Sequence, residues 1–125
     1  MGLRAHTSRA ASEIAYPDAK RLELAIALAG RPRLLLMDEP TAGMAAAERL
    51  ALMDLVRALA TQSRMSVLFT EHSMDVVFTY AQRVLVMARG RIIAQGAPAE
   101  VRDDPQVQEV YLGTGATFTV PAASA

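Results

Sequence analysis

Leu34-Leu35-Leu36-Met37-Asp38-Glu39-Pro40 is an apolar run that ends in two adjacent carboxylates and a proline. Continuous apolar runs of this length are typical of buried parallel strands. Open α/β sheets bind ligands outside the carboxyl ends of their strands. The run therefore predicts a strand that presents Asp38 and Glu39 at the edge of a sheet, although a solvated strand end without a chemical role explains this segment alone equally well.

A second apolar run, from Met65 to Thr70, ends in another polar pair, Glu71-His72. The segment between the two runs, from Ala46 to Thr61, has apolar residues at helical spacing. Its expected buried stripe consists of Leu50, Met53, Leu55, Val56 and Leu59. A strand, a helix and a strand of this length predict a parallel pair, whose polar ends would lie at the same edge.

The other segments predict one longer helix, a short helix, a hairpin and two more short helices. The longer helix is expected from Asp18 to Ala29, and the short helix from a Ser73 cap through Tyr80. The hairpin strands are expected from Arg83 to Ala88 and from Arg91 to Gln95, joined by a turn at Arg89-Gly90. The last two short helices are expected near Pro98 to Arg102 and from Pro105 to Leu112. Residues Gly113 to Ala125 are expected to form a loose tail.

The composition indicates a globular piece with a real core, since 52% of the 125 residues are hydrophobic and 21% are charged. Thirteen basic and thirteen acidic residues balance, which argues against a nucleic-acid surface. The absence of cysteine excludes disulfides and thiolate metal sites and fits a reducing compartment. No apolar run approaches the roughly 20 residues of a membrane span, so membrane association would require a partner.

Taken together, the segments resemble the second half of the ATP-binding subunit of an ABC transporter, in the usual order of that family. The run through Glu39 resembles Walker B with its following glutamate, and Glu71-His72 resembles the switch histidine. Thr41 to Ala46 resembles the D-loop, and Ile14 to Asp18 stands where the signature loop belongs. The features most similar to the branched-chain amino acid importer branch are Tyr16, Gly43-Met44 and Val110-Tyr111-Leu112-Gly113.

The resemblance implies an α/β fold, part of a P-loop NTPase (ABC ATPase) sandwich, with a largely parallel sheet flanked by helices and without the phosphate-loop strand. Residues 1–17 would be the end of the helical subdomain with the signature-loop region, residues 18–113 the C-terminal part of the ATPase core, and residues 114–125 a flexible tail. Without a phosphate-loop strand beside it, the strand around Val67 would have an open edge, which predicts self-association.

The resemblance also implies ATP and Mg²⁺ as ligands. Asp38 would hold Mg²⁺ through water, Glu39 would activate the attacking water, and His72 would sense the γ-phosphate. The remaining cofactor-binding positions would be Ala15, Tyr16, Pro17 and Asp18 of a degenerate signature loop and Gly43 and Met44 of the D-loop. Asp18 is expected to cap the helix that follows it.

The sequence departs from the family pattern in three places. Ala15 replaces a serine and Pro17 a glycine, which removes a hydroxyl donor and a backbone N–H from the signature loop. Ala45 and Ala46 replace a polar residue and a proline in the D-loop. No G-x-x-x-x-G-K-[ST] phosphate loop occurs in the sequence, which predicts half of a nucleotide site.

Two functions remain open. The first is an ATP-binding and ATP-hydrolysing subunit of an importer for branched-chain amino acids or related solutes, present as a fragment that is inactive alone. Its partners would be transmembrane permease subunits and a second ATP-binding subunit, identical or paralogous, at the cytoplasmic face of the membrane. The alternative is a non-catalytic remnant that acts as a dimerisation or docking module. A DNA-repair or switch ATPase of the same superfamily is disfavoured, because Gly96-Ala97-Pro98-Ala99-Glu100 looks transporter-like.

Overall fold

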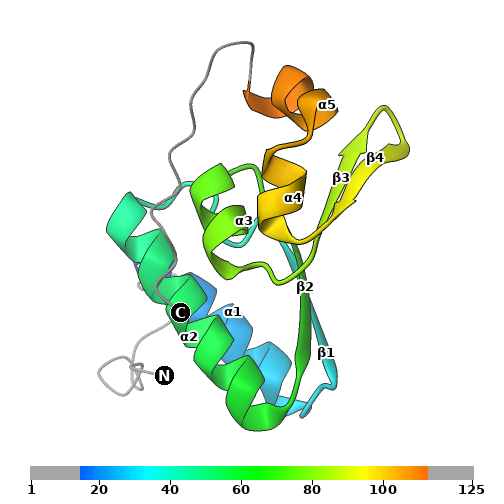
Figure 1. The fold of residues 1–125 in the computed structure, drawn as a ribbon. Helices are drawn as coiled ribbons and strands as arrows, with labels where there is room; N and C mark the ends of the chain where they lie inside the picture. Colours follow the sequence, from blue (N-terminus) through cyan, green and yellow to red (C-terminus); the bar gives the residue numbers. More distant parts are fainter. Residues whose placement is uncertain (1–14, 113–125) are drawn as a thin grey trace. The chain divides into compact units, whose positions relative to one another are not determined.

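The computed structural model describes residues 15–112, which belong to two compact units that meet in the sequence between Glu71 and His72 (Figure 1). The expectations for the end of a helical subdomain, for Ile14 and for the C-terminal tail lie outside the described residues. No helix between residues 15 and 112 combines the length and the apolarity needed to cross a bilayer.

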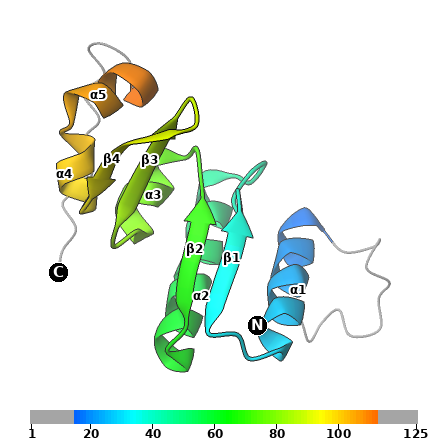
Figure 2. The same cartoon turned by 90° about the vertical axis from the view of Figure 1, so that its right-hand side faces the viewer.

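The first unit has two helices on the same side of a parallel strand pair (Figures 1 and 2). Its elements are α1 (Tyr16–Ala29), β1 (Leu34–Asp38), α2 (Ala46–Ser63) and β2 (Ser66–Thr70). The strands run in register from Leu34 beside Ser66 to Asp38 beside Thr70. The predicted strand, helix and strand are therefore confirmed, and the two strands end side by side.

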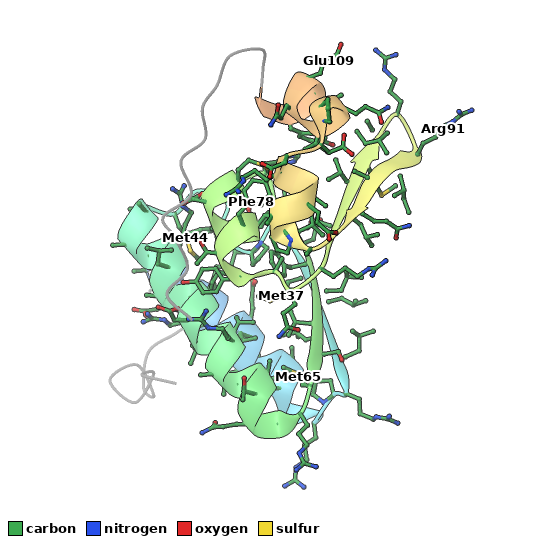
Figure 3. The ribbon with its side chains drawn as sticks, viewed as in Figure 1. Met37, Met44, Met65, Phe78, Arg91 and Glu109 are labelled. Atoms are coloured by element: carbon green, nitrogen blue, oxygen red, sulfur yellow. The ribbon has the colours of Figure 1, made fainter. Side chains whose placement is uncertain are left out.

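The helices cover one face of this strand pair and leave the other face open. The buried residues of the unit's core are Leu24, Leu35, Met44, Leu52, Val56 and Met65, of which Met44 and Met65 are labelled in Figure 3. Side chains alternate along a strand, so the opposite face carries Leu34, Leu36 and Leu68, which are 52%, 66% and 56% exposed. Parallel pairs are usually covered on both faces, so this exposed apolar face is unusual.

Two details of the helices differ from the expectation. Leu50, predicted in the buried stripe of α2, is exposed, whereas Leu52 is buried. Helix α1 begins at Tyr16 rather than at Asp18, because Pro17 in the first turn has a φ that suits a helix start. Asp18 therefore lies inside the first turn and is not the cap, which is Ala15.

The second unit is built on an antiparallel hairpin. Its elements are α3 (Met74–Tyr80), β3 (Val84–Ala88), β4 (Arg91–Gly96), α4 (Pro98–Arg102), α5 (Pro105–Val107) and a π-helical turn (Gln108–Leu112). Arg89 and Gly90 have φ values of 50° and 77°, which confirms the predicted two-residue turn. The core of the unit consists of Val84, Val86, Val101 and Val107. The helix expected from Pro105 to Leu112 is divided into α5 and the π-helical turn.

Candidate functional site

The acidic pair at the end of β1 is anchored to the end of β2. The Thr70 hydroxyl donates a hydrogen bond of 2.5 Å to Asp38 Oδ1. The Glu39 backbone N–H donates to the Thr70 carbonyl oxygen at 3.0 Å and to Thr70 Oγ1 at 3.1 Å. Asp38 and Glu39 are nevertheless both exposed. Thr70 thus fixes two neighbouring acidic residues that are both exposed.

The backbone turns sharply at Glu39. Its φ of 45° lies in the left-handed region, which costs a non-glycine residue on the order of 1 kcal/mol and persists only where surrounding contacts hold it. After this turn the chain leads inward, so that Pro40 is buried and Thr41 is 1% exposed. The acidic pair therefore lies directly before a segment that is held inside the unit.

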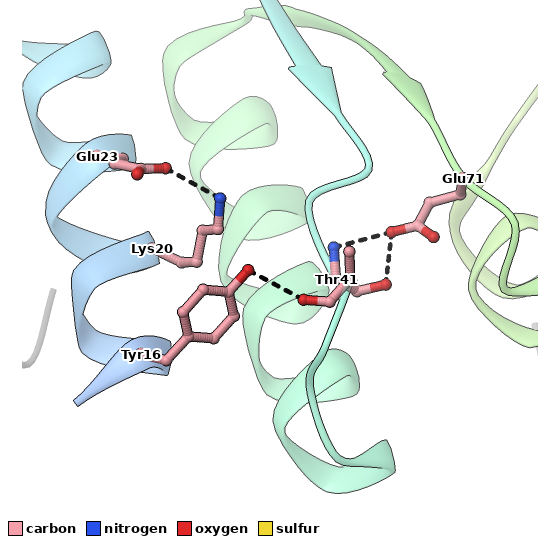
Figure 4. Close-up of polar contacts among 6 residues, drawn as sticks. Tyr16, Lys20, Glu23, Thr41 and Glu71 are labelled. Atoms are coloured by element: carbon pink, nitrogen blue, oxygen red, sulfur yellow. Dashed lines mark hydrogen bonds and ion pairs between the residues drawn. The ribbon is translucent and has the colours of Figure 1, made fainter.

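Thr41 is held by Glu71, the residue that follows β2. Glu71 Oε1 accepts the Thr41 backbone N–H at 2.9 Å and the Thr41 hydroxyl at 2.5 Å (Figure 4). Thr41 is the polar residue that is buried among the described residues. A buried polar group needs a hydrogen-bond partner, and the Glu71 carboxylate provides one. Sequence patterns single out Glu71 only beside His72, and Thr41 only as the first residue of the segment that resembles the D-loop.

The rest of the loop that resembles the D-loop leads into α2. Gly43 has a φ of 75°, which glycine adopts readily. The Met44 side chain packs in the core of the unit, so that a contact of Met44 with a second subunit would use its backbone. Ala45 is the N-cap of α2 without a side-chain acceptor, and its backbone N–H donates to Glu48 Oε2 at 3.2 Å.

The residues expected in the signature loop are engaged within the chain. Ala15 caps α1 without a side-chain hydrogen bond. The Tyr16 hydroxyl donates to the Ala42 carbonyl oxygen at 3.1 Å, and the Lys20 ammonium lies 5.6 Å from the centre of the Tyr16 ring (Figure 4). Asp18 accepts a weak ion pair from Arg21 at 3.4 Å. The structure therefore brings the start of α1 against the loop after β1.

A small hollow lies between the first turns of α1 and α2. Pro17 and Arg21 line it from α1, and Met44 and Glu48 line it from the other side, around about 200 Å³. Pockets for drug-sized ligands are usually on the order of 300 Å³ or larger. The hollow is thus smaller than the pockets that usually hold ligands of this size.

The described residues fit one part of a magnesium nucleotide site. The exposed Asp38 carboxylate is a hard oxygen donor of the kind that Mg²⁺ prefers. No group of three His, Cys, Asp or Glu side chains between residues 15 and 112 could hold a metal by itself. The single lysine of the sequence, Lys20, pairs with Glu23 at 3.3 Å. The described residues therefore suit a cation whose other ligands are water and phosphate oxygens. They include no loop that would hold the phosphates.

His72 follows Glu71 directly and begins the second unit, where its side chain is exposed. Its predicted contact with a terminal phosphate stays a prediction.

Comparison with known proteins shows a consistent set of relatives. Residues 91–117 match the family model described as "Branched-chain amino acid ATP-binding cassette transporter". The chain is 37% identical over 113 residues to the high-affinity branched-chain amino acid transport ATP-binding protein LivG of Salmonella typhimurium, covering 90% of this chain and 44% of LivG. It is 35% identical over 113 residues to BraF of Pseudomonas aeruginosa, with the same coverage of both chains.

A solved structure agrees with these sequence relatives. The ADP conformation of MJ1267, an ATP-binding cassette of an ABC transporter, matches with a TM-score of 0.76 and 34% identity, over 84% of this chain and 42% of that one. The chain belongs to the ABC transporter ATP-binding family. It corresponds to the C-terminal part of such proteins and has a partial ABC ATPase fold, and it spans less than half the length of LivG, BraF and MJ1267.

Proposed function

We propose that this ABC chain supplies the catalytic side of an ATP site in the ATP-binding subunit of a branched-chain amino acid importer. The observation that carries this proposal is the anchored acidic pair, in which Thr70 holds Asp38 and the Glu39 backbone while both residues are exposed.

In this proposal Asp38 would hold Mg²⁺ through water, and the bound metal would supply positive charge beside the terminal phosphates of ATP. Glu39 orients the attacking water and accepts its proton. His72 donates a hydrogen bond toward the terminal phosphate. The start of α1 and the loop with Gly43 would approach the nucleotide of a second ATP-binding subunit.

The phosphate loop of the proposed site would come from sequence outside these 125 residues. LivG and BraF extend over more than twice the matched length, which leaves room for such a segment. The partners would be transmembrane permease subunits and a second ATP-binding subunit, at the cytoplasmic face of the membrane. The names of the relatives and the family match over residues 91–117 support branched-chain amino acids as the transported solute.

A first experiment uses the isolated chain and tests whether the site is complete without further sequence. We expect no Mg²⁺-dependent ATP hydrolysis above the buffer rate, because the chain lacks a phosphate loop. A rate that disappears in Glu39→Gln would show instead that the 125 residues hold a complete site.

The second candidate function, a dimerisation or docking module, is favoured by the exposed face that carries Leu34, Leu36 and Leu68. Exposed apolar sheet faces and open strand edges promote association with other chains. We expect the isolated chain to self-associate in analytical ultracentrifugation, and Leu36→Glu to reduce this association by about tenfold or more. Leu50→Glu on α2, whose side chain is also exposed, is the control that should change little. A stable monomer for the unmodified chain would contradict dimerisation through this face.

A further inference from the structure

The loop from Glu39 to Met44 is bonded on two sides within the first unit. Glu71, after β2, accepts two hydrogen bonds from Thr41. Tyr16, at the start of α1, donates to the carbonyl oxygen of the next residue, Ala42. The two contacts come from elements far apart in the sequence and reach adjacent residues of one loop (Figure 4).

The Glu71 contact is the stronger of the two for three reasons. A single carboxylate oxygen accepts both the backbone N–H and the hydroxyl of Thr41. Hydrogen bonds to a charged acceptor are about twice as strong as neutral ones. Thr41 is 1% exposed, so water does not replace the carboxylate easily, whereas Tyr16 is 51% exposed.

The contact between Glu71 and Thr41 also affects the left-handed turn at Glu39. A residue in this region returns to ordinary backbone angles unless the residues on both sides are held. On one side the Glu39 N–H is bonded to Thr70. On the other side the Glu39 carbonyl oxygen accepts the Ala42 N–H at 3.1 Å within the loop, and Pro40 has no N–H to donate. Thr41 is the first residue after the turn whose side chain is bonded to a residue outside the loop. Glu71 therefore fixes the far end of the turn.

We propose that Glu71 is a positioning residue that sets the course of the loop from Glu39 to Met44, and with it the turn at Glu39. Within the proposed function, on which this consequence rests, Glu71 fixes the water-activating carboxylate and the loop that faces a second subunit. Since His72 follows Glu71 in the chain, the same residue links the loop to the segment that carries the proposed phosphate sensor.

The experiment measures amide hydrogen exchange by NMR in the full 125-residue chain, so it requires no nucleotide and can fail independently of the proposed function. In Glu71→Ala, we expect the Thr41, Ala42 and Met44 amides to exchange about tenfold faster or more, because the N–H and the hydroxyl of Thr41 both lose their acceptor. The amides of Leu52 and Val56 in α2 should keep their rates.

Conservative replacement distinguishes positioning from a general loss of stability. Glu71→Gln retains a side-chain oxygen in the same place, so we expect loop exchange within about threefold of the unmodified chain. Glu23→Ala, which removes an exposed acid of α1, is the matched control and should leave the loop unchanged.

Two results would overturn the proposal. The first is unchanged loop exchange in Glu71→Ala. The second is an equal increase at the loop and at Leu52 and Val56, which would mean that Glu71 only stabilises the unit as a whole. If Glu71→Ala does not fold, Thr41→Val replaces it, since this variant removes only the hydroxyl that Glu71 accepts. In Thr41→Val, faster exchange confined to the loop amides would support the proposal, and unchanged exchange of these amides would contradict it.

Discussion

The ends of β1 and β2 and the N-terminus of α1 belong to the same unit but differ in how their polar groups are bonded. At the strand ends, Thr70 and Glu71 hold Asp38, Glu39 and Thr41 through a continuous set of hydrogen bonds. At the start of α1, Ala15 occupies the cap position and offers no side-chain acceptor to the first turn. The acidic pair and the loop after it are thus held by side-chain hydrogen bonds from the end of β2, whereas the first turn of α1 has no side-chain cap.

Breaking the well-bonded region should have the largest effect. Thr41→Val keeps the shape of the buried side chain but removes the hydroxyl that Glu71 accepts. We expect the free energy of unfolding to fall by roughly 1 to 3 kcal/mol, because a buried hydrogen bond to a charged group is lost. Urea unfolding of the unmodified chain and the variant measures this difference.

Thr61→Val is the control for this change, since Thr61 is exposed and bonds only a carbonyl of its own helix. It should alter the free energy of unfolding by less than about 0.5 kcal/mol. An equal decrease in the free energy of unfolding in both variants would mean that the hydrogen bond to Glu71 stabilises the unit no more than an exposed one.

Repairing the poorly capped region should have a smaller effect of opposite sign. Ala15→Ser supplies a hydroxyl oxygen at the N-cap of α1, and such caps stabilise helices by about 0.5 to 2 kcal/mol relative to alanine. We expect a gain near the lower end of this range, measured as a higher urea midpoint. Ala27→Ser, at an exposed position inside the same helix, should lower stability slightly through helix propensity. A loss of stability in both serine variants would show that α1 does not need a cap.

The hydrogen bond from Tyr16 to Ala42, which joins the two regions, should contribute least to the free energy of unfolding. Tyr16→Phe removes the hydroxyl that bonds Ala42 but keeps the ring beside Lys20. Because Tyr16 is half exposed, we expect a loss of about 0.5 kcal/mol or less in urea unfolding. Tyr16→Leu removes the ring as well and should cost more; a larger loss for Tyr16→Phe than for Thr41→Val would reverse the proposed order of the two contacts.

The regular elements could be predicted from the sequence because their signals are local. The apolar runs predicted β1 and β2, and the spacing between them predicted their parallel pairing, which the register confirms. The Arg89-Gly90 turn followed from the short gap between two strands and from glycine's tolerance of positive φ. Helical spacing also predicted the burial of Met53 and Val56 on α2.

The missed features depend on contacts that are distant in sequence. Thr41 and Glu71 are 30 positions apart, so no local pattern shows that a threonine after a proline will be buried against a glutamate. The burial of Leu52 rather than Leu50 depends on which face of α2 meets the strands, and helical spacing alone allows either choice for residues at the border of the stripe. Asp18 was expected as a cap because aspartate favours that position, but Pro17 starts the helix earlier.

We propose above that Glu39 provides the water-activating carboxylate of an ATP site whose phosphate loop would come from sequence outside these 125 residues. The most direct measurement uses a fusion in which the N-terminal part of Salmonella LivG, outside the match, is joined to this chain, and compares Mg²⁺-dependent ATP hydrolysis with and without Glu39→Gln. We predict hydrolysis by the fusion that falls by about a hundredfold or more in Glu39→Gln and is unchanged in the control Glu23→Gln. Hydrolysis that persists at the same rate in Glu39→Gln would contradict the claim.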